Sequence, residues 1–347
     1  MLLIAACCGA FSGIVACSSN GGSTCSGPAS GPIGTRSSAL GDNPAGLEVI
    51  EHAPSSGKAN AIVVALHGCT QTAQQYETVG WNELGDKLGF AVVYPQQTAV
   101  NNGQKCFRWW DSAHVTRGQG EAQSIASMAE AAKTKYGAAH VFVTGLSAGA
   151  AMAVAMLAAY PDLFEAGAIM AGIPYGCAKN ANDSFTCMSG KEETAAEWTA
   201  LLPTDARSKP PRVSIWTGDA DYVVRPTNAE QLVRQWSGAH GDMSAKAATT
   251  DTVGAAKHET FAGGAVERWT IPKMGHGVAV SPAEGCGTAG AFVVDAKLCS
   301  TQKAAEFFGL TGDGIAAPSP PRDAVPSSGG NGASGGDGAS QQGDCTN

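Results

Sequence analysis

The sequence lacks the residue patterns that hold a metal ion. None of its eleven cysteines forms a C-x-x-C pair, and its seven histidines do not cluster. Zinc sites need about three or four such ligands at short spacing, so we expect no metal ion and no cofactor. Positive charge is also scarce. The formal net charge of -8 argues against nucleic acid or an anionic membrane surface as a partner.

Charged side chains are missing from the first 35 residues. The apolar stretch 2–15 is interrupted by glycine and serine and is short for a membrane span, which indicates a signal sequence over 1–17. Residues 14–17, I-V-A-C, resemble the lipobox of bacterial lipoproteins, whose cysteine is acylated. No basic segment precedes the apolar stretch, so an ordinary cleavable signal stays open beside lipidation of Cys17. We expect export, with the protein secreted or lipid-anchored in the bacterial cell envelope.

Two stretches are too poor in apolar side chains to form a core. Residues 18–45 are rich in Ser, Gly and Pro, which predicts a flexible linker. Residues 311–347 have the same character, which predicts a low-complexity, disordered tail. The remaining part, 46–310, has the size of a single domain. We expect this domain to be monomeric and to contact the membrane only through an N-terminal lipid.

Inside that domain, short apolar runs alternate with helical segments, and no repeat of 20–50 residues is visible. This alternation predicts an α/β fold with a mostly parallel central sheet and helices on both faces. The stretch 47–51 is expected to be an edge strand. Further strands are expected at 61–66, 90–94, 141–143, 166–171, 212–216 and 266–271, and helices at 80–88, 150–159 and 301–308.

The sequence G-L-S-A-G at 145–149 lies between a β-branched run and an alanine-rich helix. This context is typical of a nucleophile elbow, in which a strained strand-to-helix turn presents a serine and the flanking glycines avoid backbone clashes. Ser147 is therefore the candidate nucleophile. A second match at 332–336, centred on Ser334, has no strand before it and no helix after it.

A serine nucleophile needs a histidine base and a carboxylate that orients the histidine. The strand at 212–216 leads into T-G-D-A-D-Y-V-V, which holds two carboxylates. The G-x-x-D-x-x-V spacing favours Asp221 as the acid, with Asp219 as the alternative. His276 lies between two glycines after the last strand, which favours it as the base. The chain order Ser147, Asp221, His276 is the order of the α/β-hydrolase triad.

Hydrolysis of an acyl group also needs backbone N–H groups that stabilise the oxyanion. The residue after the nucleophile, Ala148, is expected to supply one of them. The loop after the strand at 61–66 is expected to supply the other, through the Cys69 amide. His67, in the same loop, is interpreted as a structural residue.

The cysteines indicate an oxidising compartment. Two of them, Cys7 and Cys8, leave with a signal sequence and Cys17 is the candidate for acylation, so eight remain. Sequence proximity suggests two pairs, a third pair is plausible, and the two cysteines left over make a fourth, although connectivity stays open. The pairs are Cys177 with Cys187, Cys286 with Cys299, Cys69 with Cys106, and Cys25 with Cys345.

Several motifs together resemble the poly(3-hydroxybutyrate) depolymerase-type esterases, a family that includes feruloyl and acetylxylan esterases. They are L-H-G-C-T-Q at 66–71, G-F-A-V-V-Y-P at 89–95, C-F-R-W-W at 106–110, G-L-S-A-G at 145–149, W-T-G-D-A-D-Y-V-V-R-P at 216–226 and G-H-G at 275–277. The resemblance implies an α/β-hydrolase fold and a serine esterase. It assigns the triad to Ser147, Asp221 and His276, and the oxyanion amides to Cys69 and Ala148.

The substrate class stays open between polyester, oligomer and plant cell-wall esters. Trp109 and Trp110 suit an acyl or sugar cleft, and packing in a core is the equally frequent alternative. Tyr175 follows the end of a strand and is a further candidate for the wall of this substrate cleft. A catalytically silent envelope protein that binds without hydrolysis is the remaining alternative, because a fold alone does not establish activity.

Overall fold

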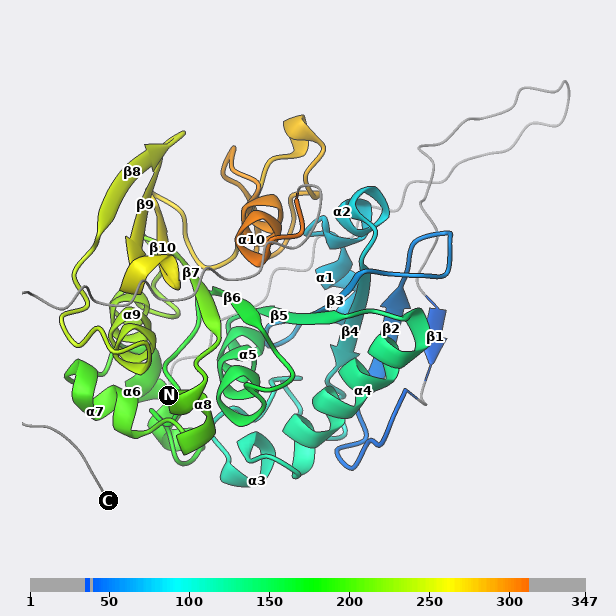
Figure 1. The fold of residues 1–347 in the computed structure, drawn as a ribbon, viewed down its shortest axis with the longest axis horizontal. Coiled ribbons are helices and arrows are strands. Elements are labelled where there is room, and N and C mark those ends of the chain that lie inside the picture. Colours follow the sequence, from blue (N-terminus) through cyan, green and yellow to red (C-terminus); the bar gives the residue numbers. More distant parts are fainter. Residues whose placement is uncertain (1–34, 38–39, 312–347) are drawn as a thin grey trace, which may run out of the picture. The chain divides into compact units, whose positions relative to one another are not determined.

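The computed structural model describes residues 35–37 and 40–311 (Figure 1). Its strands form one ten-stranded sheet and one small two-stranded sheet within these residues. No helix in residues 40–311 combines the length and the apolar character that crossing a bilayer requires.

The strands, in chain order, are β1 (Thr35–Ser37), β2 (Glu48–His52), β3 (Ala61–Leu66), β4 (Ala91–Gln96), β5 (His140–Leu146), β6 (Ala166–Met170), β7 (Arg212–Gly218), β8 (Thr249–Val253), β9 (Ala256–Phe261), β10 (Val266–Ile271), β11 (Val278–Val280) and β12 (Val293–Asp295). The helices are α1 (Ala73–Glu77), α2 (Trp81–Leu88), α3 (Ser112–Val115), α4 (Gly120–Tyr136), α5 (Ala148–Ala159), α6 (Ala181–Met188), α7 (Ala195–Ala200), α8 (Thr204–Ser208), α9 (Thr227–Ala239) and α10 (Ser300–Phe308). Two short 3-10 turns, η1 (Ala262–Gly264) and η2 (Pro282–Glu284), follow β9 and β11.

The large sheet is parallel in its centre and antiparallel at both ends. Its strand order is β1-β2-β4-β3-β5-β6-β7-β10-β9-β8. All neighbouring pairs from β4 to β10 in this order are parallel. The pairs β1–β2, β2–β4, β10–β9 and β9–β8 are antiparallel. The predicted mostly parallel sheet is therefore confirmed.

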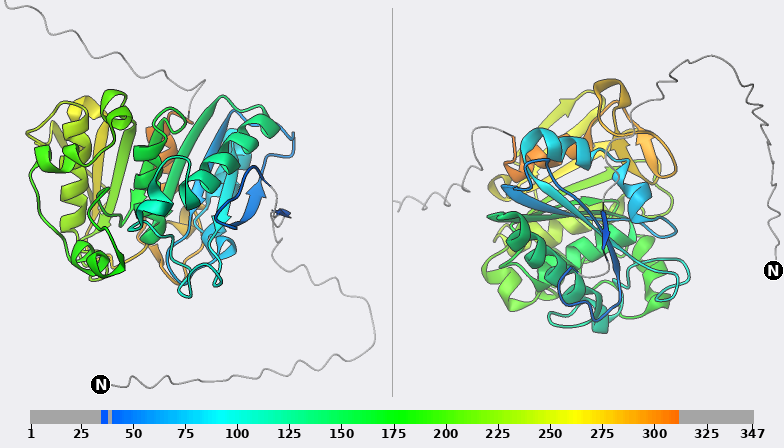
Figure 2. Two further views of the ribbon diagram at one scale, coloured as in Figure 1. Left: turned by 90° about the horizontal axis from the view of Figure 1, so that it is seen from below. Right: turned by 90° about the vertical axis from the view of Figure 1, so that its right-hand side faces the viewer.

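Alternation along the central strands divides the core into two clusters. In β3, which is buried throughout, Ile62 and Val64 belong to one cluster, and Ala61 and Val63 to the other. Successive side chains of a strand point to opposite faces, so both faces of the sheet need a cover. Helices α4, α5 and α9 cover one face, and α1, α2 and α10 cover the other (Figure 2).

The seven predicted strands are all present, within a few residues of the predicted bounds. The expectation that 47–51 is an edge strand is wrong, because β1 pairs along the outer side of β2, with Thr35 opposite Glu51. A strand of three residues is too short to show a two-residue alternation in the sequence. β1 lies inside the stretch 18–45, whose assignment as a linker stays a prediction.

Two features were not predicted. Helix α4 buries most of its residues, serines among them, so its sequence shows no apolar stripe against a polar face. The hairpin of β8 and β9 extends the sheet beyond β10, and β8 is exposed along most of its length. Its threonines and aspartate carry no alternation that would mark a half-buried strand.

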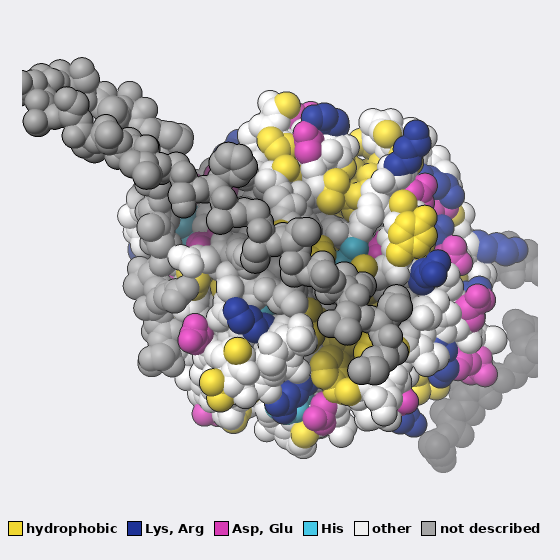
Figure 3. Space-filling view, turned by 180° about the vertical axis from the view of Figure 1, so that it is seen from behind, with side chains coloured by type: hydrophobic (Ala, Val, Ile, Leu, Met, Phe, Trp, Pro, Cys, Tyr) yellow, Lys and Arg dark blue, Asp and Glu magenta, His cyan; other side chains and the backbone are white. Residues whose placement is uncertain are grey.

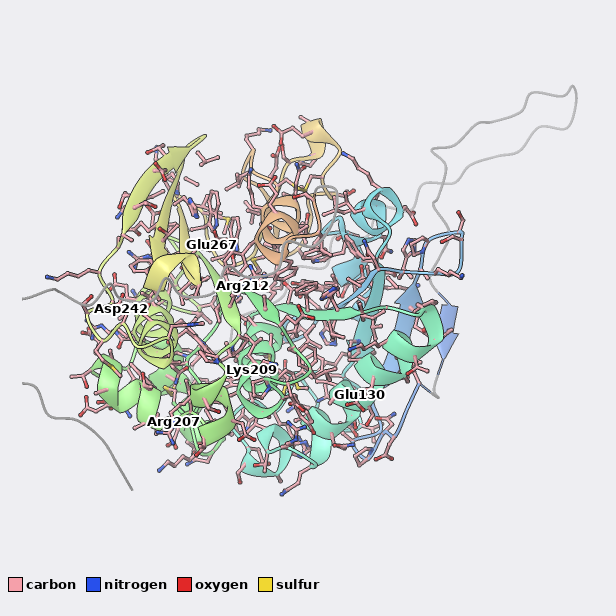
Figure 4. The ribbon with its side chains drawn as sticks, in the orientation of Figure 1. Glu130, Arg207, Lys209, Arg212, Asp242 and Glu267 are labelled. Atoms are coloured by element: carbon pink, nitrogen blue, oxygen red, sulfur yellow. A yellow bond between two sulfur atoms is a disulfide. The ribbon has the colours of Figure 1, made fainter. Side chains whose placement is uncertain are left out.

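Two charged side chains, both labelled in Figure 4, connect β7 with α10 and with β10. Arg212, at the start of β7, donates to the carbonyl oxygens of Phe307 and Phe308, so it binds the C-terminal end of α10. A cation is favourable there because helix carbonyls accumulate partial negative charge. Glu267, on β10, accepts hydrogen bonds from Ser214 and Trp269.

Candidate active site

Ser147 lies in a strained turn between β5 and α5. Its backbone has φ 58° and ψ -118°, and its N–H donates to the carbonyl of Met170 in the next strand at 3.0 Å. The neighbouring glycines leave no room for a side chain. A Cβ at Gly145 would lie 2.4 Å from the backbone of Gly149, and a Cβ at Gly149 would lie 2.2 Å from the Leu66 oxygen. The predicted turn geometry is therefore present, with Ser147 half-buried.

Asp221 is buried in the turn after β7, and both oxygens of its carboxylate accept hydrogen bonds. Oδ1 accepts the N–H groups of Val223 and Val224 at 2.8 and 3.0 Å. Oδ2 lies 2.7 Å from Nδ1 of His276. The structure thus pairs His276 with the favoured carboxylate. The alternative, Asp219, instead accepts the backbone N–H of Lys273, and so ties the acid turn to the histidine loop.

His276 lies on the loop after β10 and is nearly covered, with 9% of its side chain exposed. Because the carboxylate only accepts, Nδ1 carries the proton and Nε2 is left as an acceptor. The ring of Phe292 meets the imidazole edge to face at 6.0 Å between centroids. The carbonyl of Phe292 accepts the N–H of Val278 at 2.9 Å, so this aromatic residue is attached directly to the histidine loop.

The loop after β3 lies against the elbow. A Cβ at Gly68 would be 3.5 Å from Cβ of Ser147. Gln71 shapes the loop, because its Oε1 accepts the Gly68 N–H at 2.8 Å and its Nε2 donates to the Ala291 carbonyl at 3.4 Å. Among the described residues, no acceptor is paired with the N–H of Cys69 or Ala148. Both amides are therefore available for an oxyanion.

His67 takes part in the same loop as a neutral, fully buried side chain. Its Nδ1 donates to the Gly68 carbonyl at 2.8 Å, and its Nε2 accepts the Gln97 N–H at 3.1 Å. Burial lowers the pKa of His67 to about 4. These contacts use both ring nitrogens and agree with the structural role expected for this residue.

Three of the four expected disulfides are present: Cys69–Cys106, Cys177–Cys187 and Cys286–Cys299. The first joins the loop after β3, residues 67–72, to the loop after β4. We call residues 67–72 the oxyanion loop, after the role expected for the Cys69 amide. The third closes the segment that carries Phe292. The remaining expected pair, Cys25 with Cys345, lies outside the described residues, as do Cys17 and Ser334.

The candidate wall residues are half-buried. Trp109 and Trp110 meet edge to face at 5.6 Å and pack against the core cluster on the α1 and α10 side. Tyr175 packs against the other cluster, and its backbone N–H and carbonyl both bind the side chain of Gln235 in α9. The structure therefore brings the two tryptophans together and places Tyr175 with the opposite core cluster.

Comparison with known proteins identifies the family. Residues 53–260 match the family model described as Esterase PHB depolymerase. The chain is also 45% identical over 292 residues to poly(3-hydroxyalkanoate) depolymerase C of Paucimonas lemoignei, covering 80% of this chain and 70% of that protein. The chain belongs to the PHB depolymerase esterase family. The resemblance found in the sequence motifs is confirmed, and this esterase is a carboxylic ester hydrolase.

Two further relatives extend the comparison. Feruloyl esterase B of Thermothelomyces thermophilus is 32% identical over 216 residues, covering 58% of this chain and 73% of that protein. The solved structure of the acetyl xylan esterase from Aspergillus awamori aligns with a TM-score of 0.67 at 27% identity, covering 81% of this chain and all of that one, 100%. The esterase therefore has the α/β-hydrolase fold, as expected.

Sequence reasoning missed several residues around the candidate site. Gln71 belongs to the L-H-G-C-T-Q motif, yet its contact with Ala291 joins positions 220 apart in the chain. No motif or periodicity in the sequence marks Phe292, and its φ of 60° is unusual for a residue with a bulky side chain. Glu121 carried no signal at all, because an acidic residue in the first turn of a helix is ordinarily exposed.

Glu121 is nonetheless buried, with 1% of its surface exposed. Its Oε1 accepts from Nε2 of Gln97 at 2.6 Å, and its Oε2 accepts the backbone N–H of Arg108 at 2.7 Å. Burial raises the pKa of Glu121 to about 7, against the opposing effect of these two hydrogen bonds. The folded protein therefore favours the protonated acid more than the unfolded chain does.

Gly149→Ala is expected to lower the free energy of unfolding by about 1–3 kcal/mol and to reduce ester hydrolysis, because the added methyl would push the Leu66 carbonyl and the oxyanion loop away. Chemical denaturation and a kcat measurement test this. Gly103→Ala is the control, since a Cβ there meets open space. Unchanged stability and kcat in Gly149→Ala would contradict the described contact.

The stability of the esterase is expected to depend on pH through Glu121. Its pKa is raised from 4.5 to about 7 on folding, so its contribution is fully present below pH 4.5 and is lost as the pH rises through about 7. The unfolding free energy of the wild type relative to Glu121→Gln should therefore fall across this window. Glu130→Gln, an exposed change on the same helix, should show no such trend. A flat difference for Glu121→Gln would rule out the raised pKa.

Proposed function

We propose that this chain is an exported serine esterase that hydrolyses carboxylic esters through Ser147, His276 and Asp221. The observation that carries the proposal is the buried Asp221 carboxylate held 2.7 Å from Nδ1 of His276. This pair follows strands of the same parallel sheet that presents Ser147 at its strained turn. An oriented histidine is what a serine hydroxyl needs to become a nucleophile at neutral pH.

The reaction proceeds in two halves. Oγ of Ser147 attacks the ester carbonyl carbon while Nε2 of His276 takes the hydroxyl proton, and Asp221 stabilises the imidazolium. The N–H groups of Cys69 and Ala148 bind the oxyanion of the tetrahedral intermediate. His276 then passes the proton to the leaving alcohol, and an acyl-enzyme remains. Water, activated by the same imidazole, attacks the acyl-enzyme and releases the acid.

For the substrate we favour a polyhydroxyalkanoate ester, as polymer or oligomer. The supporting observation is the 45% identity with the depolymerase, against 35% with the probable acetylxylan esterase A of Aspergillus flavus and 32% with the feruloyl esterase. A feruloyl or acetylxylan ester is the second candidate, and the aromatic pair Trp109–Trp110 supports it, since aromatic faces bind sugar and cinnamoyl rings as well as apolar acyl groups.

Export is supported by the three disulfides, because such bonds persist in oxidising compartments. We propose a signal sequence at 1–17 with lipidation at Cys17, a linker at 18–45, the esterase domain at 46–310 and a low-complexity tail at 311–347.

We further propose that the protein is a monomer. On the face shown in Figure 3, acidic and basic side chains are interspersed with hydrophobic ones. This mixed surface fits an uncharged ester better than a polyanion.

Ser147→Ala tests the proposed function. The purified full chain is assayed on p-nitrophenyl butyrate, an emulsified polyhydroxybutyrate film, methyl ferulate and acetylated xylan. We expect hydrolysis by the wild type and a fall by about three or more orders of magnitude in Ser147→Ala, the loss that follows removal of a triad nucleophile. Ser334→Ala, at the second G-x-S-x-G match, is the control and should keep full activity.

The preferred substrate in this assay decides between the polyester and cell-wall alternatives. Equal activity of the wild type and Ser147→Ala would refute the nucleophile assignment. A wild type that is inert on every substrate would favour the silent binding protein.

A further inference from the structure

The buried carboxylate of Glu121 stands at the centre of a small polar cluster beside the candidate active site. A buried charge is costly unless it is fully hydrogen-bonded. Besides its hydrogen bonds from Gln97 and Arg108, Oε1 of Glu121 lies 3.5 Å from Nδ1 of His114, which is within ion-pair distance without being a hydrogen bond. Nε2 of His114 faces Nη1 of Arg108 at 3.1 Å, and the guanidinium also donates to the Asn101 carbonyl. Every group around the carboxylate is therefore held by a second partner.

Gln97 connects this cluster to the oxyanion loop. While its side chain donates to Glu121, its own backbone N–H donates to Nε2 of His67 at 3.1 Å. The same side-chain nitrogen also lies 3.3 Å from the Cys106 carbonyl. A shift of Gln97 would therefore move both His67 and the end of the loop after β4.

The segment 97–108 is joined to the oxyanion loop at two more points. Cys106 forms the disulfide with Cys69, the residue whose amide is the candidate oxyanion donor. The N–H of Thr70, which has a φ of 65°, donates to the Gln104 carbonyl at 2.7 Å. The position of the Cys69 amide thus depends on this segment, and the segment is fastened to helix α4 through Glu121.

We infer that Glu121 is a positioning residue for ester hydrolysis, which holds the segment 97–108 so that the Cys69 amide meets the oxyanion. This inference rests on the proposed function. Glu121 acts through Gln97 and the Arg108 backbone, and it touches neither the ester nor the triad. Since Arg108 directly precedes Trp109, the same contact also fixes the start of the aromatic pair.

The contacts explain why the side chain is a carboxylate. Both partners, Nε2 of Gln97 and the N–H of Arg108, are donors. Above its raised pKa of about 7 the carboxylate is ionised and accepts on both oxygens, whereas an amide would turn its own N–H₂ group toward one of the donors. One end of the segment would then have to move. Oxyanion donors act only at about 2.7–3.1 Å from the oxygen, so a small displacement of the Cys69 amide is enough to weaken its hydrogen bond to the oxyanion and so to destabilise the transition state.

Glu121→Gln tests the inference with p-nitrophenyl butyrate at a pH above the raised pKa of Glu121, where the wild-type carboxylate is ionised. We expect kcat per active site, counted by titration with a p-nitrophenyl phosphonate, to fall about 10- to 100-fold, less than the full loss of an oxyanion donor. We expect KM to change by less than about twofold, because the oxyanion contact is made mainly in the transition state. Glu130→Gln makes the same charge change on the same helix, at the exposed position labelled in Figure 4, and should behave as the wild type.

A merely structural role would give a different result. Unfolding lowers the number of titrated sites without changing kcat per site, so an unchanged kcat in folded Glu121→Gln overturns the inference. If Glu121→Gln yields no folded protein, Gln97→Met tests the same link, because it removes the donor and leaves the carboxylate in place. We then expect kcat to fall at least about fivefold at unchanged KM, and a wild-type kcat overturns the inference.

Ser147→Ala separates this inference from the proposed function. A wild type without esterase activity, or an active Ser147→Ala, would refute the proposed function whatever Glu121→Gln does. An active wild type, an inactive Ser147→Ala and a fully active Glu121→Gln would refute only the positioning role.

Discussion

The lack of space between backbones at the turn after β5 is the constraint on which the rest of the site depends. Only a residue without a side chain fits at position 149, because the carbonyl of Leu66 lies where a Cβ would be. This close approach is possible because β3 and β5 are parallel neighbours, with Leu66 opposite Gly145. The same register ends both strands together. It therefore sets the loop that carries Cys69 directly against Ser147.

The loops around Ser147 are held by one another as well as by the sheet. Gln71 connects the oxyanion loop to the segment that carries Phe292, and the Phe292 carbonyl binds the histidine loop. Asp219 binds the histidine loop from the acid turn. The disulfide Cys69–Cys106 links the oxyanion loop to the loop after β4, and Cys286–Cys299 closes the segment that carries Phe292. The loops around the site are thus linked in series, so that a displacement of one loop is passed to the next through hydrogen bonds.

The sequence was informative where the chemistry is local. The strand at 61–66 and the strained turn at Ser147 each follow from a few adjacent residues, and both are present. Asp221, which the spacing of its turn favours over Asp219, lies against Nδ1 of His276. The sequence was uninformative where the residues in contact lie far apart along the chain. Glu121 binds Gln97 across 24 positions, and its burial depends on helix α4, which has no apolar stripe to reveal it. The strand β1 was too short to be seen. Long-range contacts and very short elements leave no periodic trace in a single sequence.

Covalent labelling with a p-nitrophenyl alkylphosphonate tests the central claim most directly. Oγ of Ser147 would attack phosphorus and displace p-nitrophenolate, and the stable adduct would occupy the oxyanion site. Peptide mapping by mass spectrometry should find one adduct, on Ser147, appearing in step with the loss of esterase activity. An adduct on another residue, or full activity in protein that is labelled at Ser147, would contradict the account.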